Sequence, residues 1–224
     1  MVAAPLRYTG RITVSQTNVT NPGETIRPPD ATSVAAERYA LAVVLPLWML
    51  AGSTDYALHR RSRIEATSGT YEARLHLLGI ALAAPPALAG LLCEIDAGVI
   101  ALMAAGYVAH LGMTISDVAY ADERRRIVPF EQHVHALLEL MPFVALSLAG
   151  LAHRAQLRAL LGRGEAPRFA FRRKRRPVPP LPLAATVAAF GLLVALPFAK
   201  EYVRCVRYAR TARENVAYAP RATP

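Results

Sequence analysis

The chain has 224 residues, 54% of them hydrophobic, and a mean hydropathy of +0.25. This is too apolar for an ordinary soluble domain and predicts a single all-α, polytopic membrane helix bundle. The net charge of +10 is almost entirely arginine that flanks the apolar runs, a pattern that favours contact with membrane lipids. Because a nucleic-acid groove needs a solvated fold, the same pattern argues against nucleic acid as a partner.

The chain begins with a polar segment rich in Pro, Thr, Ser and Asn that lacks the apolar core of a signal peptide. We therefore expect a flexible N-terminal arm over 1–37. Four apolar spans should form a bundle over 38–153, followed by a basic interfacial loop over 154–180 and a fifth span with a basic tail over 181–224. The expected spans, each about 20 residues as a bilayer requires, are 39–58, 73–92, 97–117, 132–152 and 181–199.

Several features of the spans and loops predict local structure. The short 93–96 segment predicts a tight hairpin, and the apolar spacing of 157–161 predicts a short interfacial helix. His153 is expected to face solvent, and the cations of 172–176 to contact lipid head groups. Prolines inside the spans are expected to kink the helices without ending them, because neighbouring helices can satisfy the carbonyls they leave free. They are Pro46, Pro85, Pro86, Pro142 and Pro197.

Each of the first four spans carries one carboxylate and one histidine at same-face helical spacing. Three pairs are four residues apart and one is seven, so both partners point the same way on a helix. Ionisable groups are costly in a membrane and are usually functional. Since successive spans alternate in direction, all eight residues should lie in one layer near one membrane face. They are Asp55, His59, Glu72, His76, His110, Asp117, Glu131 and His135. His110 should lie deepest, about 10 Å below Asp117.

Carboxylates and imidazoles without thiolates favour iron, then zinc or manganese. Eight side chains are too many for one ion, so we expect two divalent metal ions bridged by carboxylates, as helix bundles build di-iron sites. Glu139, one turn beyond His135, is a candidate further ligand or proton carrier. Tyr56, beside Asp55, is a candidate for passing electrons or protons.

Other charged residues near the spans have simpler expected roles. Three arginines of the first loop are candidates to hold a substrate head group: Arg60, Arg61 and Arg63. The fifth span shows no candidate ligand, and its cluster of Lys200, Glu201 and Arg204 is expected to be an interfacial anchor.

Two stretches, DYALHRRSRIEATSGTYEARLHLL (55–78) and VPFEQHVHALLELMPF (128–143), resemble a family of bacterial integral membrane proteins with no assigned activity. The resemblance covers the first four spans, follows the pattern DYxxHR…TSG…ExxxH…EQHVH and includes the same candidate ligands. Members are sometimes labelled diguanylate cyclases, but this chain has no GGDEF-type loop. The resemblance implies a bacterial inner membrane protein and supplies no chemistry.

These observations predict a membrane-embedded di-metal oxidoreductase, most simply di-iron, of hydroxylase, desaturase or oxidase type. Its substrate would be lipid-like or otherwise hydrophobic, and it would need an electron donor. Two alternatives stay open. Bound zinc would instead favour a membrane hydrolase, and loosely held ions would favour transport of a divalent cation or proton. Transport would also require polar residues in the far half of the membrane, where the first four spans offer few.

Overall fold

The computed structural model describes residues 31–218. Within this range, five helical segments are long and apolar enough to cross a membrane, which confirms the predicted all-α bundle. The first segment begins at Ala31, so the end of the predicted arm is helical; residues 1–30 lie outside the described range. The segments are Ala31–Ser62, Gly69–Leu92, Ala97–Asp122, Pro129–Ala152 and Pro180–Asn215.

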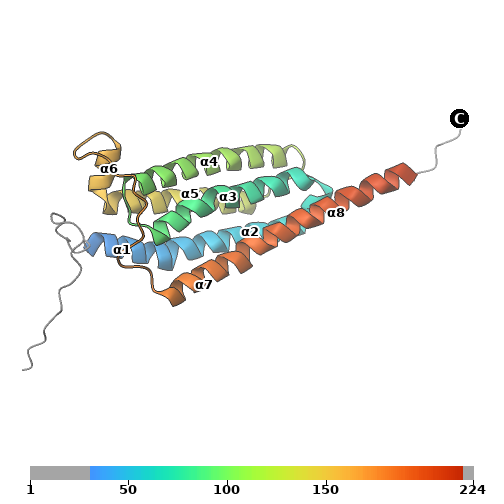
Figure 1. Ribbon diagram of the computed structural model, residues 1–224. Helices are drawn as coiled ribbons and strands as arrows, with labels where there is room; N and C mark the ends of the chain where they lie inside the picture. Colours follow the sequence, from blue (N-terminus) through green and yellow to red (C-terminus); the bar gives the residue numbers. More distant parts are fainter. Residues whose placement is uncertain (1–30, 219–224) are drawn as a thin grey trace, which may run out of the picture.

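The five segments are built from the elements labelled in Figure 1. The first contains α1 (Ala31–Tyr39), a π-helical turn (Ala40–Val44) and α2 (Leu45–Ser62). The next three are α3 (Gly69–Leu92), α4 (Ala97–Asp122) and α5 (Pro129–Ala152). The fifth contains α7 (Pro180–Phe190), a second π-helical turn (Gly191–Ala195) and α8 (Leu196–Tyr218). A 3₁₀ turn (Ile64–Ala66) joins α2 to α3, and the expected short helix is α6 (Arg154–Leu160).

Each π-helical turn directly precedes a helix with a proline at its second position, Pro46 or Pro197. A proline lacks an N–H, and its ring clashes with the carbonyl four residues earlier. In both spans, the carbonyl four residues before the proline lies within the π-helical turn, which is wider than a turn of α-helix. In the fifth span it belongs to Leu193, and Ser53 Oγ of α2 lies 3.0 Å from it. The same hydroxyl lies 2.8 Å from the Met49 carbonyl of its own helix, so its single proton is shared between the two acceptors. It gives the carbonyl that Pro197 leaves free a partner on a neighbouring helix and links the fifth span to the first.

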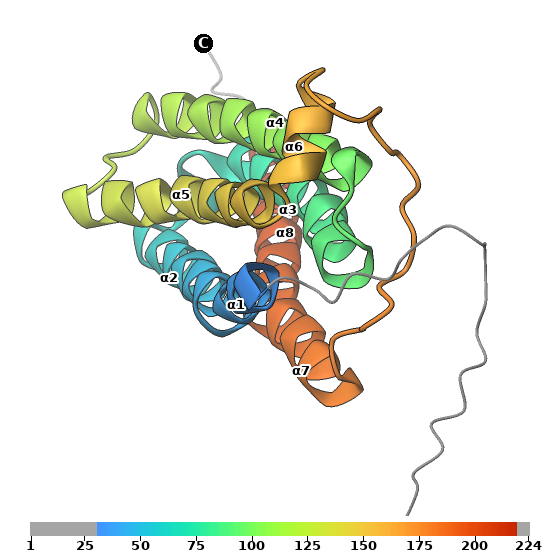
Figure 2. The same ribbon diagram turned by 90° about the vertical axis from the view of Figure 1, so that its left-hand side faces the viewer.

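Helices α2 to α5 lie side by side, and α8 packs against α2 and α3 (Figures 1 and 2). Because the spans alternate in direction, α2 and α4 end where α3 and α5 begin. This end of the bundle carries the acid–histidine pairs. The C-terminal part of α8 continues beyond it.

The opposite end is closed by the loop that follows α6. Asp96 caps α4 by accepting a hydrogen bond from the Val99 N–H (2.9 Å) and also accepts one from the loop residue Ala170 (2.8 Å). Further along the loop, the Lys174 N–H donates to the carbonyl of Leu92 (2.9 Å). The basic part of the loop is therefore fixed against the end of α3.

Candidate metal centre

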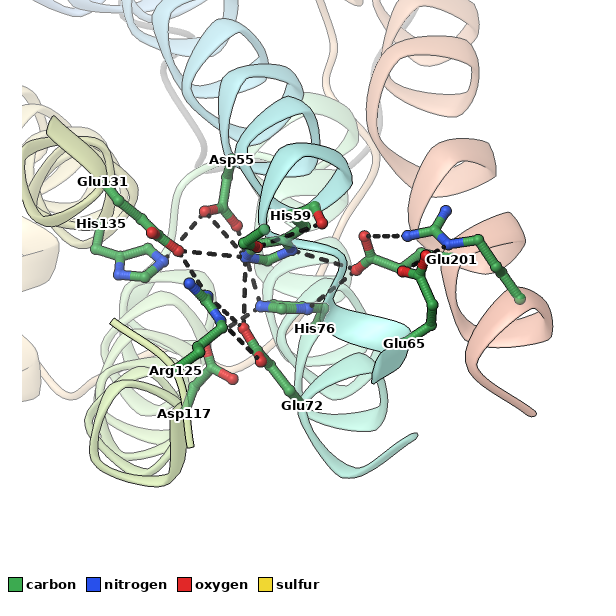
Figure 3. Close-up of polar contacts among 12 residues, drawn as sticks. Asp55, His59, Glu65, Glu72, His76, Asp117, Arg125, Glu131, His135 and Glu201 are labelled. Atoms are coloured by element: carbon green, nitrogen blue, oxygen red, sulfur yellow. Dashed lines mark hydrogen bonds and ion pairs between the residues drawn. The ribbon is translucent and has the colours of Figure 1, made fainter. Parts of the chain in front are cut away.

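The acid–histidine pairs converge at one end of the bundle (Figure 3). The pair on α2 lies near its C-terminal end, and the pairs on α3 and α5 lie in their first two turns. One aspartate from the end of α4 completes the set. All seven side chains are buried within the bundle: Asp55, His59, Glu72, His76, Asp117, Glu131 and His135.

The ligand atoms of these residues form two groups, in each of which they lie within 4.8 Å of one another. The first group joins α2 to α5, and the second joins α3 to α4. Both are compact enough to hold a metal ion. We call them group 1 (Asp55, His59, Glu131 and His135) and group 2 (Glu72, His76 and Asp117).

Group 1 is centred on Asp55. Its Oδ1 lies 3.1 Å from Nε2 of His135 and 3.4 Å from Nε2 of His59. Nε2 of His59 is also 3.8 Å from Glu131 Oε1. Asp55 Oδ1 and both Nε2 atoms are buried without a hydrogen-bond partner among the described residues. Buried polar atoms in native proteins are normally partnered, so this donor set fits a cation.

Group 2 lies next to group 1 and has no residue in common with it, but Asp55 of group 1 lies between the two. His76 Nε2 is 3.2 Å from Asp117 Oδ2 and 4.0 Å from Oδ2 of Asp55. The two oxygens of Asp55 thus face different groups. Glu72 Oε1 lies 3.5 Å from His59 Nε2 of group 1. Asp55 is therefore the side chain best placed to bridge two ions.

The fifth span offers one candidate ligand, contrary to the prediction that it shows none. Glu201 of α8 is fully buried, and its Oε1 lies 3.3 Å from Nδ1 of His59 and 3.5 Å from Nδ1 of His76. With these histidines it forms a third group of metal-binding size. Arg204 contacts the other oxygen of Glu201: its Nη2 lies 3.5 Å from Glu201 Oε2. Its Nε lies 3.1 Å from Oε2 of Glu65. Because α8 runs on past the apolar stretch, Glu201 of this charged turn packs inside the bundle and is not part of an interfacial anchor, whereas Lys200 is exposed.

Arg125, in the loop between α4 and α5, is a second residue of the centre that the sequence did not indicate. It is buried, and its Nη2 lies 2.6 Å from Oε1 of both Glu72 and Glu131. Burial would lower its pKa, but the hydrogen bonds and charges of the two glutamates outweigh this and raise the pKa above its ordinary value. The guanidinium therefore stays charged and links one carboxylate of group 1 to one of group 2.

His110 does not join either group, contrary to the prediction. It is buried on α4, two turns below Asp117, where its Nδ1 lies 3.5 Å from Thr114 Oγ1. Its ring meets that of Trp48 edge-on, with centroids 6.3 Å apart. Because His110 is seven residues from Asp117, it lies on the same face of α4. It is two helical turns deeper, however, and this separates it from the other candidate ligands.

The remaining candidates lie around the centre without belonging to its groups. Glu139 is half-buried one turn beyond His135. Tyr56 is half-buried with its ring 6.0 Å from that of Phe198, which also packs on His76 at 5.0 Å. Their catalytic roles stay predictions. The same holds for the head-group role of the exposed side chains of Arg60, Arg61 and Arg63.

An apolar cavity of about 230 Å³, the near cavity, borders the two groups. Its polar end is formed by four of the candidate ligands, and its walls come from all the spans. Apolar side chains such as Met49, Leu138 and Phe198 line it. The centre therefore has access to a space that fits a hydrophobic molecule. The ligands at the polar end are Asp55, His76, Asp117 and His135.

Comparison with protein-family models gives no match. Comparisons with curated proteins and with solved structures likewise give no significant match. The resemblance to a bacterial membrane protein family therefore stays a prediction, and function has to be argued from the centre itself.

Proposed function

We propose that this protein is a membrane-embedded di-metal oxidoreductase whose two metal ions, iron in the first place, are held by groups 1 and 2. The observation that carries the proposal is the position of these groups. Two buried sets of carboxylates and imidazoles adjoin each other at the polar end of an apolar cavity. Ligands of this type suit iron, zinc and manganese.

Charge balance supports two divalent ions. The centre contains five buried carboxylates: Asp55, Glu72, Asp117, Glu131 and Glu201. Arg125 supplies one permanent positive charge within hydrogen-bonding distance of two of them, and the charge of Arg204 beside Glu201 is matched by that of Glu65. Two divalent ions with neutral histidines would supply the other four charges. Unbalanced charge in a low-dielectric interior is very costly, so this occupancy would leave the centre neutral.

Two bound iron ions would supply activation of dioxygen. In a hydroxylation, one oxygen atom would be inserted into a substrate C–H bond, and the other would leave as water with two protons and two electrons from an external donor. The chain would provide the rest. The near cavity would orient the substrate and exclude water, and Glu139 and Tyr56 are the candidates for moving protons or electrons. The partners would be membrane lipids, a hydrophobic substrate and an electron donor, in a bacterial inner membrane.

The near cavity favours an enzyme over a transporter. A path for divalent cations or protons needs polar groups along its whole length. The walls of the near cavity away from the centre are apolar apart from residues such as His110, Thr114 and Thr186. An apolar space beside the ligands suits a substrate that arrives laterally from the bilayer.

Elemental analysis of the detergent-purified protein tests the proposal. We expect about two iron ions per chain and a visible absorption band that changes with oxygen. His135→Ala should remove metal, whereas His133→Ala should not, because His133 is exposed on the same helix. Two firmly held zinc ions would favour the hydrolase, and weakly held ions with uptake into liposomes would favour transport. A protein that binds none of these metals would overturn the di-metal centre.

A further inference from the structure

A second cavity of about 260 Å³, the far cavity, lies at the opposite end of the bundle from the metal centre. It is bounded by α1, α3, α4 and α5 and by the basic part of the loop after α6. Its body is apolar, with walls that include Leu41, Met103 and Ala145. It is therefore another space for a hydrocarbon group.

The two cavities adjoin. They share a set of lining residues from α2, α3 and α4 that extends from the middle of the bundle to the far end of α3: Leu45, Trp48, Ala83, Ala87, Leu91 and His110. On α3, the stretch from His76 at the metal centre to Leu91 spans fifteen residues, which is about 22 Å of helix. Together the cavities form a long apolar space that covers most of the roughly 30 Å hydrocarbon core of a bilayer.

The far cavity has a basic mouth. Lys174, Arg175 and Arg176 line it, against the carboxylates of Glu37 and Glu94. Both acids fix the loop: Glu37 Oε1 lies 2.7 Å from Lys174 Nζ, and Glu94 accepts the backbone N–H of Arg175 at 2.7 Å. Three cations line the mouth against two carboxylates, so positive charge is in excess by one here.

His153 lies at this mouth as well. It is half-buried, not solvated as the sequence suggested. Burial and the nearby Lys174 lower its pKa, so it can offer a neutral hydrogen bond beside the cations.

We propose that the two cavities together bind one single-chain fatty acid, with its carboxylate at the basic mouth and its methyl end at the metal centre. This substrate class rests on the proposed function. A basic mouth at one end of a long apolar space matches an anion on an extended chain. A substrate bound in this direction presents carbons far from its carboxylate to groups 1 and 2. Oxidation is then directed to the distal part of the chain.

The direction of binding can be measured with nitroxide-labelled stearic acid. The full chain is placed in nanodiscs of neutral phosphatidylcholine, loaded with Mn²⁺ and washed. One probe carries the nitroxide near its methyl end and the other near its carboxylate. We expect both to give an immobilised spectrum and Mn²⁺ to broaden only the methyl-end label strongly. With Mn²⁺ bound to the washed protein, equal broadening of both labels, or stronger broadening near the carboxylate, would overturn the proposal.

Variants separate the two parts of the site. Ala87→Phe fills the junction of the cavities and should weaken binding of the probe by about tenfold or more. Ala81→Phe is the matched control, because Ala81 is exposed on the same helix and lines neither cavity. A double Arg175→Gln, Arg176→Gln variant should weaken binding of the acid but not of its methyl ester. An ester that binds the native protein as tightly as the acid does would refute the role of the mouth.

Failure of the metal centre gives a different result from failure of this proposal. If the protein binds no metal, the immobilised spectrum and its loss in Ala87→Phe still show the cavity occupied, and only the proposed oxidation fails. If metal binds but Ala87→Phe and Ala81→Phe take up the probe equally, the fatty-acid site fails while the metal centre stands.

Discussion

Glu201 contacts His59 on the side opposite to the candidate metal ligands. Its Oε1 lies 3.3 Å from Nδ1 of His59, whereas Nε2 of the same ring lies 3.4 Å from Asp55 Oδ1. The same Glu201 oxygen is 3.5 Å from Nδ1 of His76. A carboxylate that accepts the Nδ1 proton fixes the tautomer in which Nε2 has a free lone pair. Metal-bound histidines commonly have such partners.

We therefore expect Glu201→Gln to weaken metal binding by about 10–100-fold, the usual cost of losing such a partner. The amide has no negative charge, so it holds both imidazoles less firmly in the required tautomer. Competition with a chelator, measured on the purified protein, gives the affinity. Glu214→Gln is the matched control, because Glu214 is exposed on the same helix. Equal affinities in the two variants would show that Glu201 does not position the ligands.

The burial of Glu201 could not be predicted from hydropathy, because hydropathy identifies only the apolar part of a helix. The fifth run loses its apolar character near Lys200, and charged residues at the end of a span usually contact head groups. In the structure α8 continues to Tyr218, so this turn still faces the bundle. One signal was available: Phe198, Glu201 and Cys205 are spaced three and four residues apart and are all buried, which is the inward face of a helix.

Arg125 and the metal ions have related electrostatic roles, since both neutralise Glu72 and Glu131. Arg125→Ala leaves these two buried glutamates without a cation, which should destabilise the metal-free protein by about 3–5 kcal/mol. Added metal supplies charge at the same place, so the metal-induced rise in Tm should be larger than in the native protein. Thermal denaturation with and without metal measures both effects.

Arg126→Ala is the control for Arg125→Ala, because Arg126 is exposed one residue away. It should leave both the stability and the response to metal unchanged. If the metal-induced rise in Tm is the same in the Arg125 variant as in the native protein, the arginine and the ions do not neutralise the same carboxylates.

Three successive arginines in one loop carry no sign of which one is buried. Only the α-helical spacing of Asp117, Ala121 and Arg125 points weakly to Arg125, because successive members are four residues apart and all three are buried. Which arginine is buried depends on the conformation of the loop, and this cannot be predicted from a single sequence. By contrast, the convergence of the acid–histidine pairs could be predicted, since it depends only on helical periodicity and on alternating spans. The same rule places His110 two turns, about 10 Å, below Asp117, and this depth is what keeps it out of both groups.

Ser53 stabilises the proline kink of the fifth span. Ser53→Ala removes the hydroxyl that lies 3.0 Å from the Leu193 carbonyl and leaves that carbonyl with one partner fewer. We expect a loss of about 0.5–1.5 kcal/mol in the free energy of unfolding. Ser116→Ala is the control, because the Ser116 hydroxyl donates only to Gly112 of its own helix among the described contacts (2.8 Å). Denaturant titration in detergent compares the two, and equal losses would mean that the contact between spans adds nothing.

The close contact of α3 and α4 depends on Gly106. A Cβ added at this position would lie 2.7 Å from Cγ of Pro86 and 3.4 Å from the carbonyl oxygen of Leu82. A proline ring and a helix backbone cannot move aside cheaply, so Gly106→Ala should push the helices apart and cost about 1–3 kcal/mol.

Gly112→Ala is the matched control on the same helix, because an added Cβ there meets nothing within 4 Å. It should be neutral or stabilise by up to about 1 kcal/mol, since alanine favours the helix over glycine. Fluorescence of Trp48, the single tryptophan of the chain, follows the unfolding of both variants. If Gly106→Ala is as stable as Gly112→Ala, the two helices do not pack as closely as this contact requires.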